Sequence, residues 1–218
     1  MAYTLQNEVK ALEKQLLTLA AMVEENVQHA VKALLERDAD LARRVVKCDD
    51  QVNRLEVDLE EECLKVLALH QPVANDLRTI IGIIKINNDL ERIADQAVNI
   101  SERALAVMEI SRVDSPLELG VMSAKVIDML EKALDSLVNA NIRLARQVLE
   151  LDEDVDRIHS ENYRLFKDFV REDPESIDAV LNYLTVSRHL ERVADLATNI
   201  AEDVIYLTEG EIVRHTIA

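Results

Sequence analysis

Residues 90–102 read Leu-Glu-Arg-Ile-Ala-Asp-Gln-Ala-Val-Asn-Ile-Ser-Glu, and one hundred positions later residues 190–202 read Leu-Glu-Arg-Val-Ala-Asp-Leu-Ala-Thr-Asn-Ile-Ala-Glu. The acidic residues and the asparagine hold the same relative positions in both copies, whereas a merely solvated helix face would be free to vary. The chain is therefore an internal duplication, and each half is expected to carry the same polar feature.

On a helix, the polar positions of this repeat share one face. Each residue turns the side chain by about 100°, so these positions fall within an arc of about 80°. The other positions form an apolar arc that can pack on neighbouring helices. The polar stripes consist of Glu91, Asp95, Asn99 and Glu102 in the first copy and of Glu191, Asp195, Asn199 and Glu202 in the second.

The composition favours long helices over strands. Of 218 residues, 49% are hydrophobic and 31% are charged, which is typical of a globular protein that can bury a core. Glycine and proline occur three times each, and aromatic residues make up 3% of the chain. This leaves little material for turns or strands, so we predict an all-α fold.

The net charge of −17 restricts the partners that we expect. Nucleic acids and anionic membrane surfaces attract proteins through Lys and Arg clusters, which the sequence lacks, so neither is expected to bind. Metal ions and basic protein surfaces are better matched. The chain begins with mixed polar residues and has no run of eighteen apolar residues, so we expect no membrane insertion and a cytoplasmic location.

Helix-start and helix-stop residues divide the first half into three helices. The first is predicted from about Leu5, and the second follows a cap at Asp38 or Asp40. The third has Pro72 in its first turn and runs to about Ile110.

The second half repeats this plan. Its predicted boundaries are a capping box from Ser115 to Glu118 with Pro116 in the first turn, a cap at Asn139 or Asn141, the Asp173-Pro174 pair and a terminating Gly210. We therefore predict two tandem three-helix bundles, residues 1–112 and 113–218, related by pseudo-twofold symmetry and packed together through apolar faces.

The second helix of each half supplies a further polar pair, four residues apart and so on one helix face. Asp49 pairs with Asn53, and Asp152 with Asp156. Glu56 and Glu60 extend the first pair, whereas the corresponding places in the second half hold His159 and Tyr163. If the second and third helices of each bundle lie side by side, their oxygen atoms converge, and a multivalent cation would relieve the repulsion between them.

The donor set indicates which metals fit. Carboxylate and amide oxygens suit Mg, Mn, Ca or oxidised iron, and His159 leaves zinc or iron open at the second site. Of these we favour iron or zinc. Cys48 and Cys63 belong to no Cys-x-x-Cys pair, so we expect reduced thiols and no zinc-thiolate site.

Catalysis has little support in the sequence. The phosphate-loop, dinucleotide, zinc-protease and serine-hydrolase motifs are all missing, and the nearest approach to a di-iron motif is a single Asp156-x-x-His159. A solvated acidic face would explain one Glu-x-x-x-Asp pair. It does not explain an asparagine at the same place in both copies, because helix stability alone does not require asparagine there.

The duplicated Leu-Glu-Arg-x-Ala-Asp-x-x-x-Asn-Ile-x-Glu, the upstream Asp-x-x-Val-Asn-Arg-Leu-Glu, and Gln71-Pro72-Val73-Ala74 followed by Asp76-Leu77-Arg78 resemble the PhoU family over essentially the whole chain. The resemblance implies a cytoplasmic, non-enzymatic regulator of phosphate-specific transport, built of two three-helix bundles. Such a protein represses the phosphate-starvation response by contacting the ATP-binding subunit of the phosphate ABC transporter and the sensor histidine kinase. We also expect a homodimer.

The resemblance further implies multinuclear metal clusters on the acidic motifs. The first-rank ligands that it implies are Asp49, Glu91, Asp95, Asp152, Asp156, Glu191 and Asp195, and the second-rank ligands are Asn99, Glu102, Asn199 and Glu202. Because Asn53 offers a neutral oxygen where Asp156 offers a carboxylate, the first site is expected to bind metal more weakly.

Two further expectations concern ligands other than metals. A metal-free scaffold, whose acidic stripes meet basic surfaces of a partner, stays open as an alternative. Direct phosphate binding is not expected, because the sequence shows no Gly-rich or Arg-rich anion nest, although phosphate could bind through a metal.

Overall fold

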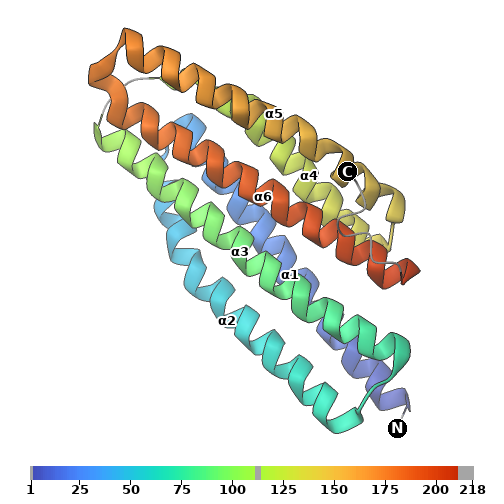
Figure 1. Ribbon diagram of the computed structural model, residues 1–218. Helices are drawn as coiled ribbons and strands as arrows, with labels where there is room; N and C mark the ends of the chain where they lie inside the picture. Colours follow the sequence, from blue (N-terminus) through green and yellow to red (C-terminus); the bar gives the residue numbers. More distant parts are fainter. Residues whose placement is uncertain (1, 111–113, 211–218) are drawn as a thin grey trace.

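The computed structural model describes residues 2–110 and 114–210, and these ranges form long helices with no strand (Figure 1). The predicted all-α fold is confirmed. The predicted boundary between residues 112 and 113 lies outside the described residues. The helices are α1 Ala2–Glu36, α2 Ala39–His70, α3 Ala74–Ile110, α4 Leu119–Asn139, α5 Ile142–Glu172 and α6 Ile177–Glu209, with a short 3-10 turn, η1, at Pro174–Ser176.

Three of the predicted helix ends are found as expected. Asp38 caps α2, its side chain accepting a hydrogen bond from the Leu41 N–H at 2.9 Å. Asn141 caps α5 in the same way. Gly210 ends α6 with a φ of 74°, a left-handed conformation that glycine adopts without strain.

The predicted capping box at Ser115 is wrong, because α4 begins only at Leu119. The Ser115 hydroxyl instead accepts a hydrogen bond from the Leu117 N–H at 3.2 Å. The Glu118 N–H donates to Oδ1 of the buried Asn162 on α5 at 2.8 Å. A tertiary contact therefore fixes the entry into α4, and the local pattern of residues 115–118 does not reveal it.

The two other proline signals also mark helix boundaries less directly than predicted. Pro72 precedes α3, which begins at Ala74 after Gln71 has ended α2 in a left-handed conformation. Pro174 opens the 3-10 turn η1, and α6 begins three residues later at Ile177. Each proline thus stops the preceding helix but lies before the first turn of the next α-helix.

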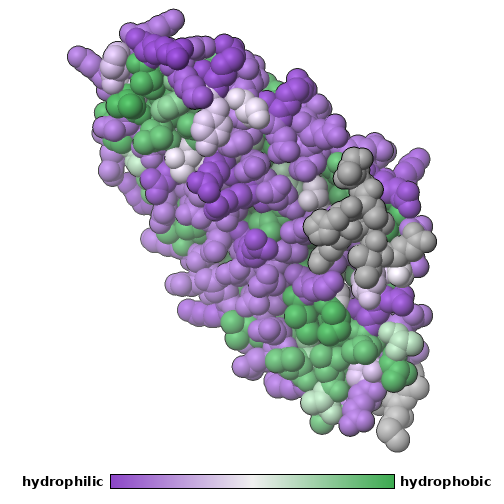
Figure 2. Space-filling model, viewed as in Figure 1, coloured by the Kyte–Doolittle hydropathy of each residue, from purple (hydrophilic) through white to green (hydrophobic). Residues whose placement is uncertain are grey.

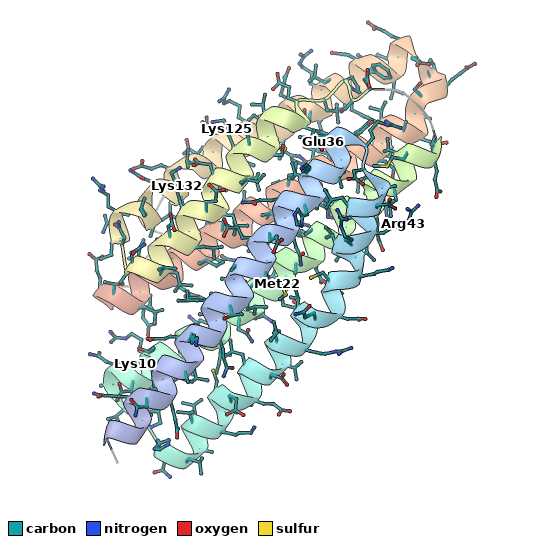
Figure 3. The ribbon with its side chains drawn as sticks, turned by 180° about the vertical axis from the view of Figure 1, so that it is seen from behind. Lys10, Met22, Glu36, Arg43, Lys125 and Lys132 are labelled. Carbon is teal, nitrogen blue, oxygen red and sulfur yellow. The ribbon has the colours of Figure 1, made fainter. Side chains whose placement is uncertain are left out.

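The helices form two three-helix bundles, α1–α3 and α4–α6, in which each helix contacts the other two. Figure 1 shows α3 and α6 side by side in the middle, with α2 beyond α3 and α5 beyond α6. Seen from behind, α1 and α4 cover the opposite face (Figure 3). The bundles meet mainly through α3 and α6, with a smaller contact between α1 and α4.

Three polar contacts show that α3 and α6 run antiparallel. Lys85 Nζ lies 3.2 Å from Asp203 Oδ1, and His189 Nδ1 lies 2.9 Å from Gln96 Oε1. Arg103 Nη1 donates to Asn182 Oδ1 at 3.4 Å. Since residue numbers rise along α3 as they fall along α6, this register brings residue 92 level with residue 195, and residue 95 level with residue 192.

One continuous apolar core runs through both bundles. It contains the repeated leucines Leu90 and Leu190, which are fully buried. Small side chains of the repeat, such as Ala97 and Ala197, are fully buried in the same core. No helix within residues 2–110 and 114–210 combines the length and the apolar content that crossing a membrane requires.

Leu90→Ala should destabilise the whole molecule, because its side chain is fully buried in the core that both bundles share. We expect a loss of about 2–5 kcal/mol in the free energy of unfolding, measured by urea denaturation. Leu181→Ala is the matched control, since that leucine is 49% exposed and should cost far less. Two separated unfolding transitions in the Leu90→Ala protein would contradict a shared core.

Candidate metal centres

The first acidic cluster lies between α2 and α3 and contains Asp49, Asn53, Glu56, Glu91 and Asp95. Burial raises the pKa of Glu91, and the carboxylates of Asp95, Glu56 and Asp49 raise it further. Burial also raises the pKa of Asp95, to which Asp49 adds. Carboxylates from the two helices therefore face one another closely enough to oppose each other's ionisation.

The second acidic cluster lies between α5 and α6 and contains Asp152, Asp156, Glu191 and Asp195. Burial raises the pKa of Asp152 to about 6, and the largest further contributions come from Asp156, Asp195 and Glu191. The pKa of Asp195 is also raised, first by burial and then by Glu191 and Asp156. All seven carboxylates that were expected as first-rank metal ligands thus lie in the two clusters, three in the first and four in the second.

Three buried oxygen atoms in the clusters have no hydrogen-bond partner among the described residues: Asp49 Oδ1, Asn53 Oδ1 and Asp152 Oδ1. In the first cluster, Asn53 Nδ2 donates to Asp49 Oδ2 at 3.1 Å, which leaves the other oxygen of each side chain unpaired. An unsatisfied buried polar atom costs about 1–3 kcal/mol. A cation that these oxygens coordinate would remove this cost, so the donor set fits a metal.

Besides Asn53 and Asp156, the two clusters differ where Glu56 of the first half is replaced by His159 in the second. In the first half, Asn87 Nδ2 donates to Glu56 Oε1 at 3.2 Å. At the equivalent places of the second half, His159 Nδ1 lies 2.9 Å from Ser187 Oγ. This contact engages one imidazole nitrogen and leaves Nε2 as a potential ligand, so the second half has a nitrogen donor where the first has a carboxylate.

The second-rank candidates contribute less to the clusters. Asn99 turns back along its own helix, where its Nδ2 donates to the Asp95 carbonyl at 2.8 Å. Asn199 lines a separate cavity, Glu102 is exposed and Glu202 is half-buried. Neither Glu102 nor Glu202 is among the carboxylates that raise the pKa values of the clusters.

As the side chains stand, no three His, Cys, Asp or Glu groups in the described ranges form a compact ligand set. The raised pKa values show instead that each cluster concentrates negative charge between two facing helices.

A polar cavity of about 440 Å³ crosses the α3–α6 seam and reaches an aspartate of each acidic cluster. Its lining includes Arg92 and Arg192, which the sequence analysis did not select. Both belong to the repeated Leu-Glu-Arg, but only the antiparallel register shows that they share one cavity. The complete lining is Arg92, Asp95, Gln96, Arg192, Asp195, Leu196 and Asn199.

Positive charge gathers at one edge of this cavity, around His189. Burial lowers the pKa of His189 to about 4, and Arg192, Arg103 and Arg188 lower it further. The imidazole is therefore neutral at pH 7. In a chain of net charge −17, this is a local concentration of guanidinium groups.

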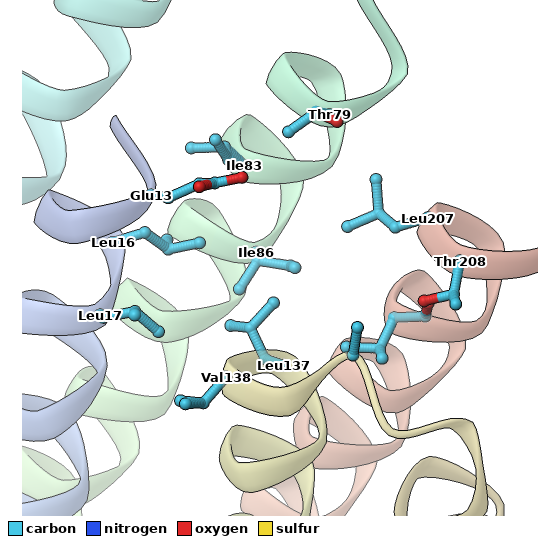
Figure 4. A pocket seen from close by; sticks show the side chains of 12 residues that line it. Glu13, Leu16, Leu17, Thr79, Ile83, Ile86, Leu137, Val138, Leu207 and Thr208 are labelled. Atoms are coloured by element: carbon cyan, nitrogen blue, oxygen red, sulfur yellow. The ribbon is translucent and has the colours of Figure 1, made fainter. Parts of the chain in front are cut away.

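A second cavity, of about 370 Å³, is apolar and has different chemistry. Figure 4 shows side chains from four helices around it, among them Leu16 of α1, Ile86 of α3, Leu137 of α4 and Leu207 of α6. Its few polar side chains include Glu13, and it contains no residue of either acidic cluster. The polar features instead lie on the face formed by α3 and α6, whose middle is largely hydrophilic (Figure 2).

Comparison with known proteins places this geometry in a family. The model of the PhoU domain matches residues 16–104 and 119–204, once in each half. The phosphate-specific transport system accessory protein PhoU homolog of Aquifex aeolicus is 40% identical over 208 residues, covering 95% of this chain and 94% of that protein. The corresponding Escherichia coli protein is 34% identical over 210 residues, covering 95% of this chain and 86% of that protein.

Solved structures agree with this match. The crystal structure of PhoU from Pseudomonas aeruginosa superposes with a TM-score of 0.91 at 39% identity, covering 94% of this chain and 99% of that one. The phosphate transport system regulatory protein PhoU from Streptococcus pneumoniae gives a TM-score of 0.84 at 31% identity, covering 96% and 99%. With two matching domains and relatives aligned along nearly its full length, the chain belongs to the PhoU family.

Proposed function

We propose that this protein is a metal-binding regulatory adaptor of phosphate uptake, acting in the cytoplasm as a homodimer and not as an enzyme. The observation that carries the metal proposal is the pair of acidic clusters, which hold three buried oxygen atoms without a hydrogen-bond partner in the described structure, two in the first cluster and one in the second. The regulatory role is supported by relatives whose names identify them as accessory proteins of phosphate-specific transport.

The ligands that we propose are the facing side chains of each cluster. In the first, Asp49, Glu91 and Asp95 would hold the ion, with Asn53 as a neutral donor. In the second, Asp152, Asp156, Glu191 and Asp195 would hold it, and His159 would add a nitrogen donor. A bound cation would supply the positive charge that lets these carboxylates ionise together, and iron or zinc suits the mixed donors of the second cluster.

As an adaptor, the protein would lower the phosphate-starvation response by contacting two partners, the ATP-binding subunit of the phosphate ABC transporter and the sensor histidine kinase. Net charge of −17 favours basic surfaces on both partners. The alternative is a metal-free scaffold in which Lys and Arg of a partner, in place of a cation, neutralise the clusters.

The second cluster should retain more metal than the first, because Asp156 offers a carboxylate where Asn53 offers a neutral amide oxygen, and because His159 can add an imidazole nitrogen. We expect Asp152→Ala plus Asp195→Ala to lose more metal than Asp49→Ala plus Asp95→Ala, measured by elemental analysis of protein purified without chelator. Asp58→Ala plus Asp178→Ala removes two exposed carboxylates from α2 and α6 outside the clusters and serves as the control. Equal losses from the two cluster variants would count against unequal sites.

The raised pKa of Asp152 predicts a pH effect on the metal-free protein. The folded state holds the proton of Asp152 up to about pH 6, well above the ordinary pKa of 3.8, so ionisation destabilises the fold. The contribution of protonated Asp152 to the free energy of unfolding is therefore complete below about pH 4, and it is lost as pH rises through about 6.

Asp152→Asn, which mimics the protonated form, should become more stable relative to the wild type as pH rises through this window. The measurement is the difference in melting temperature between the two proteins in the presence of a chelator. His189 has the opposite pH slope but is common to both proteins, so its effect cancels. A pH-independent difference would show that Asp152 ionises as freely as in the unfolded chain.

A pull-down from phosphate-replete cells tests the adaptor role. We expect the wild type and the Asp58→Ala, Asp178→Ala control to recover the transporter ATP-binding subunit, and the Asp95→Ala, Asp195→Ala variant to lose it. If chelator leaves wild-type recovery intact while the Asp95→Ala, Asp195→Ala variant still fails, the metal-free alternative is supported. If none of these proteins, the wild type included, recovers a transporter subunit, the adaptor function is ruled out.

A further inference from the structure

We propose that the polar cavity across the α3–α6 seam binds inorganic phosphate in its protonated form, with Arg92 and Arg192 donating to the phosphate oxygens and Asp95 and Asp195 accepting its hydroxyl hydrogen. The cavity adjoins the proposed metal centres and shares one aspartate with each, Asp95 with the first and Asp195 with the second. The choice of phosphate among oxyanions rests on the proposed role in phosphate uptake, whereas the oxyanion site rests on the lining of the cavity.

The two arginines supply the attraction for an anion. Guanidinium groups donate paired hydrogen bonds to the oxygens of phosphate and carry a permanent positive charge. Arg92 and Arg192 occupy equivalent places in the repeat, and the antiparallel seam brings them to one cavity from opposite helices.

The surroundings of the two arginines differ in a way that favours a ligand. Arg92 Nη1 forms an ion pair with Asp89 Oδ1 at 3.2 Å. The position equivalent to Asp89 is His189, so Arg192 lacks the acidic partner that the repeat would otherwise supply. No hydrogen bond or ion pair from a described residue engages the Arg192 guanidinium, which leaves its donors available to an anion.

The aspartates give the cavity its selectivity. Phosphate at neutral pH carries at least one hydroxyl group, so it both accepts and donates hydrogen bonds, whereas sulfate only accepts. A carboxylate such as Asp95 or Asp195 can accept the hydrogen of phosphate but would repel sulfate without compensation. A lining of two guanidinium and two carboxylate groups therefore matches hydrogen phosphate better than it matches a fully ionised tetrahedral anion.

Hydrogen bonds hold the side-chain amide of Gln96 in place beside these charged groups. Gln96 Nε2 donates to the Arg92 carbonyl at 3.3 Å, and its Oε1 lies 2.9 Å from Nδ1 of His189. Because the amide oxygen requires a donor, Nδ1 of the neutral imidazole carries the hydrogen. This network joins the two helices beside the cavity and holds the cavity wall in place before any ligand enters.

The test is isothermal titration calorimetry of the full, metal-free chain with sodium phosphate and, separately, with sodium sulfate, at neutral pH and constant ionic strength. We expect phosphate to bind the wild type and sulfate to bind much more weakly. Arg92→Gln plus Arg192→Gln should weaken phosphate binding by about tenfold or more. Arg44→Gln plus Arg143→Gln removes the same charge from exposed arginines outside the cavity lining and should retain binding.

A second variant tests the selectivity. Asp95→Asn plus Asp195→Asn replaces two acceptors by amides that can also donate, so sulfate binding should rise toward that of phosphate. Thermal unfolding by circular dichroism verifies that each variant is folded. This arm separates a specific site from general attraction of anions to arginine.

Four results would overturn the proposal: no phosphate binding to folded wild type, equal affinity for sulfate, equal loss in the Arg44→Gln, Arg143→Gln control, or no gain in sulfate binding in the double asparagine variant. Phosphate binding that requires added metal and survives in the Arg92→Gln, Arg192→Gln variant would place phosphate on the metal and also overturn it. Metal retention and transporter pull-down are measured separately, so this cavity can fail while the proposed function stands.

Discussion

The antiparallel packing of α3 on α6 is the constraint on which the other features depend. This contact is the largest between the two bundles, and buried apolar side chains from both belong to one core. The same packing leaves the polar side of both repeats on one face of the molecule. It also places Arg92 and Arg192 in a single cavity, although one hundred positions separate them in the chain. The duplication therefore creates a shared surface that neither half has alone.

The acidic clusters differ from ordinary solvated helix faces because ionising their carboxylates costs free energy. Solvated carboxylates on a helix surface repel one another only weakly, because water screens them. Here Asp152 is sufficiently desolvated and surrounded by acids that its pKa is raised to about 6. Helix stability gives no reason to keep such an arrangement in both halves, since replacing one acid by a neutral residue would remove the repulsion. A cation or a basic partner group offsets the cost in a way that the isolated protein cannot.

Local sequence patterns were sufficient for the six helices and for the facing polar pairs, because helical periodicity determines which residues share a face. Asp38, Asn141 and Gly210 mark helix ends through backbone chemistry confined to a few residues. The start of α4 could not be predicted, because Asn162, more than forty residues away, determines it through a hydrogen bond. Arg92 and Arg192 were missed for a related reason, since the register between two bundles depends on packing across the seam and not on either repeat by itself.

The departures from symmetry are as informative as the repeat. Asp156 replaces Asn53, His159 replaces Glu56 and His189 replaces Asp89, while the carboxylates at 91, 95, 191 and 195 are unchanged. All three changes lie around the clusters and the seam cavity, where they alter charge and donor type without changing the core. Gln96 and Leu196 occupy equivalent places in the repeat and both line the cavity. The α3 wall therefore offers an amide where the α6 wall offers an apolar side chain, and a ligand in the cavity would meet different groups on the two bundles that an exact repeat would make alike.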